Sequence, residues 1–307
     1  MSKNVFLFSG QGSQYVGMGK ELCEKYPQID VFKRASEILG FDLAEKINNS
    51  TEEELAKTVI SQPAIMATSL TALEAMKING IEFSAVAGHS LGEYAAMVAS
   101  GILSFEDGFK VIKARAAAMQ KAAEQNSGAM YAIIGKTAEE IEQVCDQIDG
   151  YVVPVNYNSS AQTVIAGETS AAEKAAAKFA EMGAKAVKLG VSSAFHSKLM
   201  QPAADELPPA IADIKFNKPN VEFYSNLIGG LQTDFDNMPE KLAKHIVSPV
   251  RFTSELAALQ AAGYENFVEL GPNRVLTGLV KKTLKGVNAV NVENEKTLEK
   301  ALEVLNG

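Results

Sequence analysis

Cysteine is scarce in this chain, which has two, Cys23 and Cys145, among 307 residues. They lie far apart in the sequence, and two cysteines do not make the disulfide framework typical of small secreted proteins. We therefore expect a reducing compartment, the cytoplasm. The chain also lacks a Cys-x-x-Cys motif and any cluster of cysteine and histidine with the spacing of zinc ligands. We expect no bound metal.

Basic residues are in deficit, and long apolar runs are absent. Lysine and arginine total 29 against 37 aspartates and glutamates, a net charge of -8. A chain that binds nucleic acid usually has a basic excess, so we expect no nucleic-acid partner. No stretch of 18 apolar residues occurs, and the first residues lead directly into the strand-like segment VFLFSG. We expect neither a membrane span nor a signal peptide.

The chain does contain a Gly-x-Ser-x-Gly motif, from Gly88 to Gly92. A short apolar run, 84–87, precedes it, and an Ala-rich helical stretch, 93–100, follows it. Strand, sharp turn and helix form the context of a nucleophile elbow, which exposes a serine hydroxyl at the edge of a sheet. A Cβ at either glycine would clash with the neighbouring helix or strand. We interpret Ser90 as a nucleophile, and the alternative is a chance match.

A Gly-rich loop, Ser9 to Gln14, follows the first predicted strand, Val5 to Phe8. The loop is not a dinucleotide fingerprint, because Tyr15 stands where the third glycine belongs, and it lacks the Gly-Lys-Ser/Thr of a phosphate loop. Its backbone N–H groups are suited to bind an anion or an oxyanion. An ordinary strand-to-helix turn is an equal alternative.

A serine nucleophile needs a base, and the chain offers three histidines, His89, His196 and His245. His89 adjoins the nucleophile within the turn, so we expect it to brace the elbow through a hydrogen bond. His196 follows Ser90 in chain order and lies between a predicted strand and a predicted helix, so we favour it as the base. His245 also follows Ser90. No acidic residue stands out as a third member of a triad.

Arg115 lies in a long predicted helix, from Ser104 to about Glu124. Its neighbours at 114 and 116–118 are alanines, which leave room for a ligand to approach the guanidinium group. Met119 lies four residues further on and shares the same helix face. A planar guanidinium suits a carboxylate group better than lysine does. An arginine on a solvated helix face is the competing interpretation.

The order of the predicted elements divides the chain into two units. Between 128 and 191 the predicted order is β-α-β-β-α-β, that of a ferredoxin-like unit. We place this segment as an inserted subdomain, with 1–127 and 192–307 forming the larger unit. The polar segment 156–160 is predicted as a loop that faces a cleft.

Two sites with proline mark predicted helix boundaries in the larger unit. Pro63 is expected in the first turn of a helix that runs to Lys77. Pro208 and Pro209 are expected to break the structure after a helix from Ser197 to about Glu206. Shorter helices are predicted at 19–26, 31–39 and 51–57.

Five motifs together are far more specific than the serine motif alone. They are F-S-G-Q-G-S-Q at 8–14, G-H-S-L-G-E-Y at 88–94, R-A-A-A-M-Q at 115–120, N-S-S-A-Q-T-V-I-A-G at 158–167 and A-F-H-S at 194–197. In order and spacing they resemble malonyl-CoA:acyl-carrier-protein transacylases over nearly the whole chain. The resemblance most suggests the stand-alone bacterial enzymes of type II fatty acid synthesis.

The resemblance implies an α/β fold, in which an α/β-hydrolase-like core with a parallel sheet carries an inserted ferredoxin-like subdomain. It implies that Ser90 attacks the malonyl thioester and that His196 takes its proton. The backbone N–H groups of Gln11 and Leu91 would stabilise the oxyanion. Arg115 would bind the free malonyl carboxylate as a bidentate pair.

Four other residues are assigned through the same resemblance. Phe195 is similar to the position whose bulk favours malonyl over branched extender units. Met119 and Asn158 are placed with the substrate-binding residues. The family orients its base with a backbone carbonyl, commonly that of a glutamine, and His245 stands at that position here. A solvated histidine at the end of a helix is the alternative for the His245 side chain.

The implied reaction transfers malonyl from malonyl-CoA to the phosphopantetheine thiol of acyl carrier protein and uses no cofactor. We expect a monomer. Three alternatives stay open: an esterase or thioesterase on the same scaffold, a non-catalytic module that docks a carrier protein, and the same chemistry serving polyketide assembly.

Overall fold

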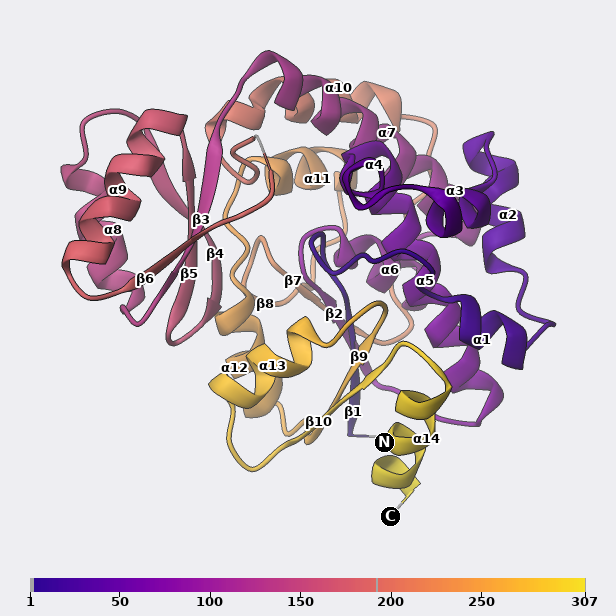
Figure 1. Cartoon of the computed structure of the whole chain (residues 1–307). Coiled ribbons are helices and arrows are strands. Elements are labelled where there is room, and N and C mark those ends of the chain that lie inside the picture. The colour runs from indigo at the N-terminus through magenta and orange to yellow at the C-terminus, as the bar shows by residue number, and fades with distance from the viewer. Residues whose placement is uncertain (1–2, 192, 307) are drawn as a thin grey trace.

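The computed structural model describes residues 3–191 and 193–306 and contains two β-sheets with helices packed against them (Figure 1). The predicted α/β class is confirmed, since one sheet is mainly parallel and the other is a separate antiparallel sheet. The unit boundary that we predicted at 192 falls on a residue outside the described part of the chain.

The larger sheet has six strands in the order β10-β9-β1-β2-β7-β8. Adjacent strands are parallel except for the edge pair of β7 and β8, which is antiparallel. The strands are β1 (Asn4–Phe8), β2 (Ala85–Gly88), β7 (Glu222–Ser225), β8 (Gly230–Leu231), β9 (Asn266–Leu270) and β10 (Asn288–Val292). Parallel sheets are covered on both faces and need apolar side chains on both. In β1, Phe6 and Phe8 belong to one core, and Val5 and Leu7 to the other.

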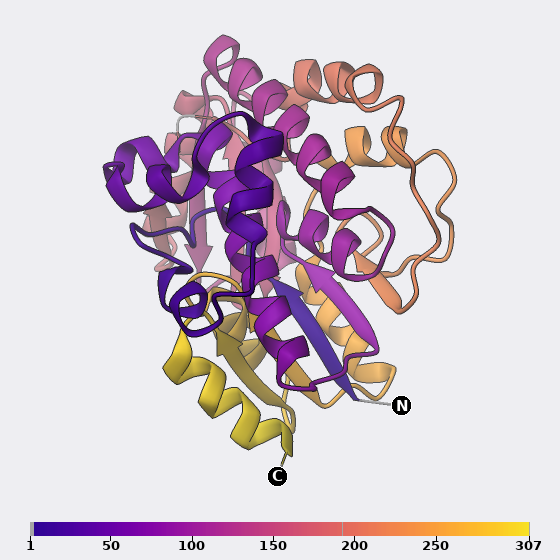
Figure 2. The ribbon, with the colours of Figure 1, turned by 90° about the vertical axis from the view of Figure 1, so that its right-hand side faces the viewer.

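Helices cover both faces of this sheet (Figure 2). The core around Phe6 receives side chains from α1 (Lys20–Lys25), α2 (Val31–Leu39), α3 (Leu43–Asn49), α4 (Glu52–Ala56), α5 (Thr58–Ile78), α6 (Gly92–Ala99), α7 (Phe105–Gln125), η1 (Lys198–Met200), α10 (Gln201–Ala210), α11 (Met238–Ile246) and α14 (Glu295–Asn306). The core around Val5 receives side chains from α12 (Phe252–Ala261) and α13 (Val275–Thr283).

Several helix boundaries differ from the predicted ones. α5 begins at Thr58, so the prediction that Pro63 opens this helix is wrong. Its packing against α6 and α7 stabilises the helix despite the backbone hydrogen bond that a proline removes. Pro208 and Pro209 lie in the last turn of α10 rather than beyond it. The sequence pattern did not predict α3. Asp42 caps the N-terminus of this helix by accepting the Glu45 N–H.

The smaller sheet is antiparallel, in the order β4-β5-β3-β6. Its elements are β3 (Ala129–Ile134), α8 (Ala138–Gln147), β4 (Val152–Ser159), β5 (Gln162–Gly167), α9 (Thr169–Glu181) and β6 (Lys185–Lys188), and the predicted β-α-β-β-α-β order is confirmed. α8 and α9 cover one face of the sheet, on the left of Figure 1. β4 extends through most of the segment predicted as a loop, with irregular pairing at Pro154/Asn156 and Tyr157/Ser159.

Two backbone hydrogen bonds connect the smaller sheet to the segment between α11 and α12. The Tyr157 N–H donates to the Val250 carbonyl at 2.9 Å, and the Val250 N–H donates to the Val155 carbonyl at 2.8 Å. These bonds hold the end of β4 against the chain that follows α11. The smaller sheet therefore forms one wall beside the carboxyl ends of β1 and β2.

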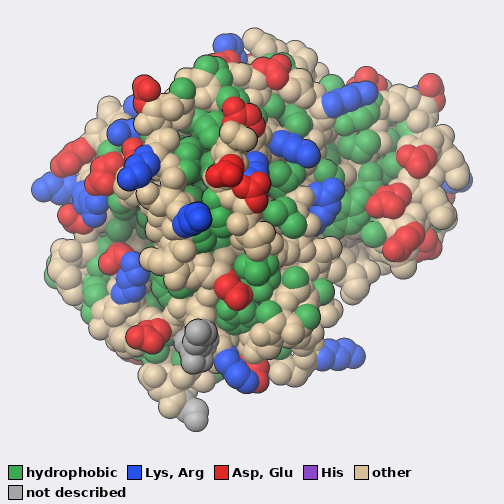
Figure 3. All heavy atoms as spheres, turned by 180° about the vertical axis from the view of Figure 1, so that it is seen from behind, with side chains coloured by type: hydrophobic (Ala, Val, Ile, Leu, Met, Phe, Trp, Pro, Cys, Tyr) green, Lys and Arg blue, Asp and Glu red, His purple; other side chains and the backbone are tan. Residues whose placement is uncertain are grey.

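Charged side chains are mixed rather than grouped on the face seen from behind (Figure 3). Acidic and basic groups alternate there, although the whole chain has a net charge of -8. Within residues 3–191 and 193–306, no helix has both the length and the apolar character needed to cross a bilayer.

Candidate active site

Ser90 occupies the tight turn between β2 and α6. Its φ of 55° lies in the left-handed region, which is uncommon for a residue with a side chain. A Cβ on Gly88 would lie 2.1 Å from the backbone carbon of Gly92, and a Cβ on Gly92 would lie 2.0 Å from the Phe8 carbonyl oxygen. The predicted clash at both glycines is confirmed. The turn thus requires glycine on both sides of a serine that lines a cleft.

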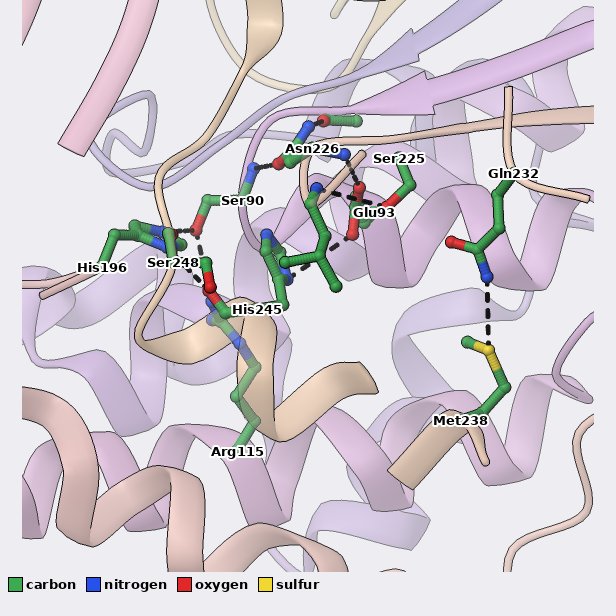
Figure 4. Close-up of polar contacts among 12 residues, drawn as sticks. Ser90, Glu93, Arg115, His196, Ser225, Asn226, Gln232, Met238, His245 and Ser248 are labelled. Carbon is green, nitrogen blue, oxygen red and sulfur yellow. Dashed lines mark hydrogen bonds and ion pairs between the residues drawn. The ribbon is translucent and has the colours of Figure 1, made fainter. Parts of the chain in front are cut away.

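The structure brings His196 to the Ser90 hydroxyl (Figure 4). The Ser90 Oγ lies 2.6 Å from His196 Nε2, across 106 positions of sequence. The His196 Nδ1–H donates to the carbonyl oxygens of His245 and Ser248, each at 3.1 Å. Because both carbonyls only accept, the neutral ring carries its proton on Nδ1 and presents a free Nε2 to the hydroxyl. The pair is therefore arranged for proton transfer from serine to histidine.

The surroundings of His196 favour its neutral form. Burial, with a smaller contribution from the positive charge of Arg115, lowers the pKa of His196 to about 3. The carbonyl oxygens at the end of α11 act in the opposite direction, because they stabilise a positive ring. At neutral pH the ring is an unprotonated acceptor. The imidazolium that forms after proton transfer already has two acceptors in place.

Arg115 extends from α7 to the same hydroxyl. Its side chain is 1% exposed, so the interpretation as an arginine on a solvated face is wrong. Its Nη2 lies 3.2 Å from Ser90 Oγ, and its guanidinium carbon lies 5.0 Å from the centre of the Tyr94 ring. No carboxylate within the described residues pairs with it, and its Nε–H has no acceptor there. A buried, unpaired cation is costly, so this position favours an anionic ligand group.

A cleft of about 650 Å³ opens beside Ser90 and His196, and Arg115 lies behind its lining residues. Ser90 and His196 lie on its wall, and four further predicted residues line it: Gln11, Met119, Asn158 and Phe195. Its walls come from the loop after β1, the helices α4, α7 and α13, and the strands of the smaller sheet. Most of the lining is apolar. Such a cleft suits a ligand that has an apolar part in addition to its charged group.

The two predicted oxyanion donors have backbone N–H groups without a partner in the described part of the chain. Neither the Gln11 N–H nor the Leu91 N–H donates to an acceptor among the described residues. Leu91 follows the nucleophile directly, at the start of α6, and Gln11 lies in the loop after β1. The Ser90 N–H, in contrast, is already used by the side-chain oxygen of Asn226 at 2.7 Å.

His89 braces the turn, as its position in the sequence predicts. Its Nε2 lies 2.8 Å from Asn158 Oδ1, and its ring meets the edge of Phe252 at 5.5 Å between centroids. Its backbone carbonyl and ring also pack closely against Gly10. Burial lowers the pKa of His89, so its ring is neutral. Asn158 thus links the elbow to the smaller sheet.

The His245 side chain is buried, and the interpretation as a solvated helix-end histidine is wrong. Its ring lies 5.4 Å from the His196 ring between centroids, and its Nδ1 lies 3.5 Å from Glu93 Oε2. Its backbone carbonyl is one of the two acceptors for His196. The other acceptor, the Ser248 carbonyl, was not predicted.

Sequence reasoning also missed Asn226, which holds the elbow from behind. Its amide nitrogen donates to the Gly88 carbonyl at 2.7 Å and to Glu255 Oε1 at 2.6 Å. Its backbone N–H donates to Glu93. One signal could have found it. Asn226 follows β7, the strand beside β2, and carboxyl ends of neighbouring parallel strands meet at one sheet edge.

Among the residues that the structure describes, no group of three or more His, Cys, Asp or Glu side chains is placed to hold a metal ion. The site offers a nucleophile, a neutral base, two free N–H donors and a cation, which together suit acyl transfer from a donor that bears an anionic group.

The chain is similar to known proteins over nearly its whole length. The profile of the family described as "Acyl transferase domain" matches residues 5–300. The chain is 41% identical to the malonyl CoA-acyl carrier protein transacylase of Bacillus subtilis (strain 168), over 99% of this chain and 98% of that protein. It is 38% identical to the enzyme of the same name from Escherichia coli (strain K12), over 99% and 100%.

Solved structures give the same result. The crystal structure of malonyl CoA-acyl carrier protein transacylase from Clostridium perfringens superposes with a TM-score of 0.94 at 41% identity, covering 99% of this chain and 98% of that one. A malonyl-transacylase in complex with a type II PKS acyl-carrier protein superposes with a TM-score of 0.94 at 36% identity, covering 99% and 100%.

Proposed function

The chain belongs to the malonyl CoA-acyl carrier protein transacylases of the acyl transferase domain family, and from this premise we propose its reaction. It transfers the malonyl group from malonyl-CoA to the phosphopantetheine thiol of acyl carrier protein, through an acyl-serine intermediate. The product supplies extender units for fatty acid synthesis. The observation that carries the proposal is the buried Arg115 guanidinium, which lies 3.2 Å from Ser90 Oγ without a carboxylate partner among the described residues.

In the first half-reaction, Ser90 Oγ attacks the thioester carbonyl while His196 Nε2 takes the hydroxyl proton. The backbone N–H groups of Gln11 and Leu91 stabilise the oxyanion, and each such donor is typically worth about 10²–10³ in rate. Collapse of the tetrahedral intermediate breaks the carbon–sulfur bond. The leaving CoA sulfur takes the proton from His196, and malonyl-serine remains.

In the second half-reaction, the phosphopantetheine thiol gives its proton to His196 and attacks the malonyl-serine carbonyl. The same two N–H groups bind the second oxyanion. When the intermediate collapses, the bond between the acyl carbon and Ser90 Oγ breaks, and the proton returns from His196 to Ser90 Oγ. The enzyme is regenerated with no net change in protonation, so the reaction needs no cofactor beyond its two substrates.

Arg115 selects the acyl group in this proposal. Its planar guanidinium binds the free malonyl carboxylate with two hydrogen bonds, which also orients the thioester carbonyl toward the N–H donors. Phe195 limits the width of the acyl site and disfavours branched extender units. Met119 and Asn158 complete its walls. The backbone carbonyl of His245 orients the base.

The remaining parts of the proposal concern organisation and setting. Residues 1–127 and 192–307 act as the catalytic core, and 128–191 act as the subdomain that closes one side of the cleft. The protein works as a monomer in the cytoplasm, without a nucleic-acid or membrane partner. The excess of acidic residues and the low cysteine content support this setting.

The test is the mass of the peptide that contains Ser90 after exposure to malonyl-CoA alone. We expect a long-lived malonyl-serine on Ser90, which disappears when the carrier thiol is added and is absent in Ser90→Ala. Steady release of CoA without a carrier would instead indicate a thioesterase. Absence of labelling by a serine-directed reagent would indicate a non-catalytic docking module.

Polyketide assembly is a second setting for the same chemistry. One observation favours this setting: the malonyl-transacylase that is bound to a type II PKS acyl-carrier protein is matched by this chain along its whole length. Rates of malonyl transfer to purified carrier proteins of the two types distinguish the settings. We expect the higher kcat/KM with the carrier of fatty acid synthesis.

A further inference from the structure

Glu93 and His245 form a buried pair directly behind the nucleophile and its base (Figure 4). Glu93 lies on α6 and His245 at the end of α11, and each side chain is 2% exposed. The Glu93 Oε2 lies 3.5 Å from His245 Nδ1. The reaction described above uses neither side chain.

The pair connects the supports of the two reacting groups. Glu93 Oε1 accepts the backbone N–H of Asn226, and Asn226 Oδ1 accepts the Ser90 N–H. His245 accepts the Nδ1–H of His196 through its backbone carbonyl. A change in the charge or position of the pair therefore affects the positions of both Ser90 and His196.

One proton is needed between the two side chains. Neither ring nitrogen of His245 has a hydrogen-bond partner within the described residues, and buried polar atoms are rarely left unpaired. A proton on Glu93 Oε2 would make that oxygen a donor to His245 Nδ1, and a small approach of the two side chains closes the hydrogen bond. The alternative is a carboxylate facing an imidazolium, which requires two charges to lose their hydration.

The groups around the pair disfavour the charged alternative. Burial raises the pKa of Glu93 to about 8, and it outweighs the Asn226 N–H, the Ser225 side chain and the charge of Arg115, which all lower that pKa. Burial, the rings of His196 and His89, and the charge of Arg115 all lower the pKa of His245. Glu255 faces Glu93 across Asn226, and its pKa is also raised, first by burial and then by the neighbouring carboxyl. Both members of the pair are thus neutral at pH 7.

We propose that Glu93 is a positioning residue that acts as a neutral carboxylic acid, donates its proton to His245 Nδ1, and so leaves the charge of Arg115 uncompensated for the acyl carboxylate. This inference rests on the proposed function, because it assumes an acyl donor with a free carboxylate. It assigns a purpose to the acidic residue that directly follows the serine motif. A neutral acid holds the elbow and the base together without competing for the guanidinium.

The inference predicts an alkaline limit that depends on the substrate. When Glu93 loses its proton, a negative charge appears behind Arg115 and opposes the binding of an anionic acyl group. A single ionisation centred near pH 8 lowers kcat/KM with malonyl-CoA by about tenfold at pH 9. Acetyl-CoA has no free carboxylate, so its kcat/KM shows a smaller fall over the same range.

Glu93→Gln and Glu93→Ala test the inference in the full-length protein. Glutamine reproduces the protonated acid, with an oxygen that accepts from Asn226 and an amide that donates to His245. We expect E93Q to lose much less activity with malonyl-CoA at pH 7 than E93A, and to show no alkaline fall. Glu269→Gln is the matched control, since it removes a buried carboxyl outside this pair, and it should leave the midpoint of the fall unchanged.

Infrared difference spectra between the wild type and E93Q provide a readout that does not depend on activity. We expect the carbonyl band of a protonated carboxyl group at pH 7, and its loss as the pH rises past 8. Absence of that band at pH 7, or a loss of activity in E93Q as large as in E93A, would overturn the inference. A band without malonyl transfer would instead count against the proposed function alone.

Discussion

The side-chain oxygen of Asn226 accepts the backbone N–H of Ser90 at 2.7 Å, across 136 positions of sequence. The amide nitrogen of the same side chain donates to the Gly88 carbonyl on the other side of His89. Asn226 therefore clamps the backbone of the elbow at both ends of its strained segment. Since Ser90 has a φ of 55°, this clamp stabilises a conformation that serine rarely adopts.

Replacing Asn226 with alanine tests the clamp. Asn226→Ala leaves the Ser90 N–H, the Gly88 carbonyl and a Glu255 oxygen without their partner, and a buried unpaired group costs about 1–3 kcal/mol. We expect a loss of about 3 kcal/mol in the free energy of unfolding, measured in urea, and a fall in kcat of at least about tenfold. Asn48→Ala, which removes an exposed bond within one helix, should change stability by about 0.5 kcal/mol or less.

The charge of Arg115 should matter for one acyl donor and not for another. Hydrogen bonds to charged groups are worth about 1.5–3 kcal/mol each, so losing a bidentate pair lowers kcat/KM with malonyl-CoA by about 100-fold or more. With acetyl-CoA, we expect Arg115→Ala to lose less than about tenfold. Equal losses with both donors would refute a role in binding the carboxylate. Arg34→Ala, which removes an exposed pair with Glu106, should leave both values unchanged.

The two glycines of the elbow should not tolerate a methyl group. In Gly92→Ala, the new Cβ would lie 2.0 Å from the Phe8 carbonyl oxygen. Rotation of a side chain cannot relieve this clash, because the backbone fixes the positions of both atoms. We expect a loss of at least about 3 kcal/mol in stability, or failure to fold. Gly278→Ala is the matched control within α13, where a Cβ meets nothing within 4 Å. There we expect a gain of about 0.5–1 kcal/mol. Urea unfolding of both variants measures the contrast.

Stability should fall as the pH rises above 6.5. Burial raises the pKa of Glu269 to about 7 and of Glu93 to about 8, and it also raises the pKa of Glu255. Above its ordinary pKa of 4.5, each of these carboxyls loses its proton in the unfolded chain but keeps it in the folded one. The folded state then binds more protons, so each group lowers stability by about 1.4 kcal/mol per pH unit until its folded pKa is passed.

Stability should also fall below pH 4.5. Burial lowers the pKa values of His89, His196 and His245, so the unfolded chain takes up protons below 6.5 that the folded chain does not. Between pH 4.5 and 6.5 the lowered histidines and the raised carboxyls act in opposite directions, so stability depends least on pH there. Urea midpoints should therefore be highest in that window. His245→Gln should reduce the acid slope by about 1.4 kcal/mol per pH unit, and an unchanged slope would contradict this account.

Elements with a local signal were predicted, and those set by packing were not. The helix over 31–39 carries its own apolar periodicity and has the predicted bounds. α5 lacks such a periodicity, because it is buried on nearly all sides. Pro63 lies inside this helix, so the proline does not mark its start either. The end of β4 was predicted as a loop because its residues are polar. Pairing with β5 and the bond to Val250 make it a strand, with Asn158 facing the cleft.

The amino-acid sequence by itself determined the position of Ser90 and the shape of its turn. Gly88 to Gly92 is one contiguous segment between a strand and a helix, and the steric demand on both glycines follows from that local order. The tertiary structure decided what surrounds the hydroxyl. Arg115 is buried rather than solvated because α7 packs against α5, α6 and α10. Asn226 follows β7, a parallel strand that pairs with β2. Parallel strands bring distant residues to one edge, and no short-range pattern in the chain records which residues meet there.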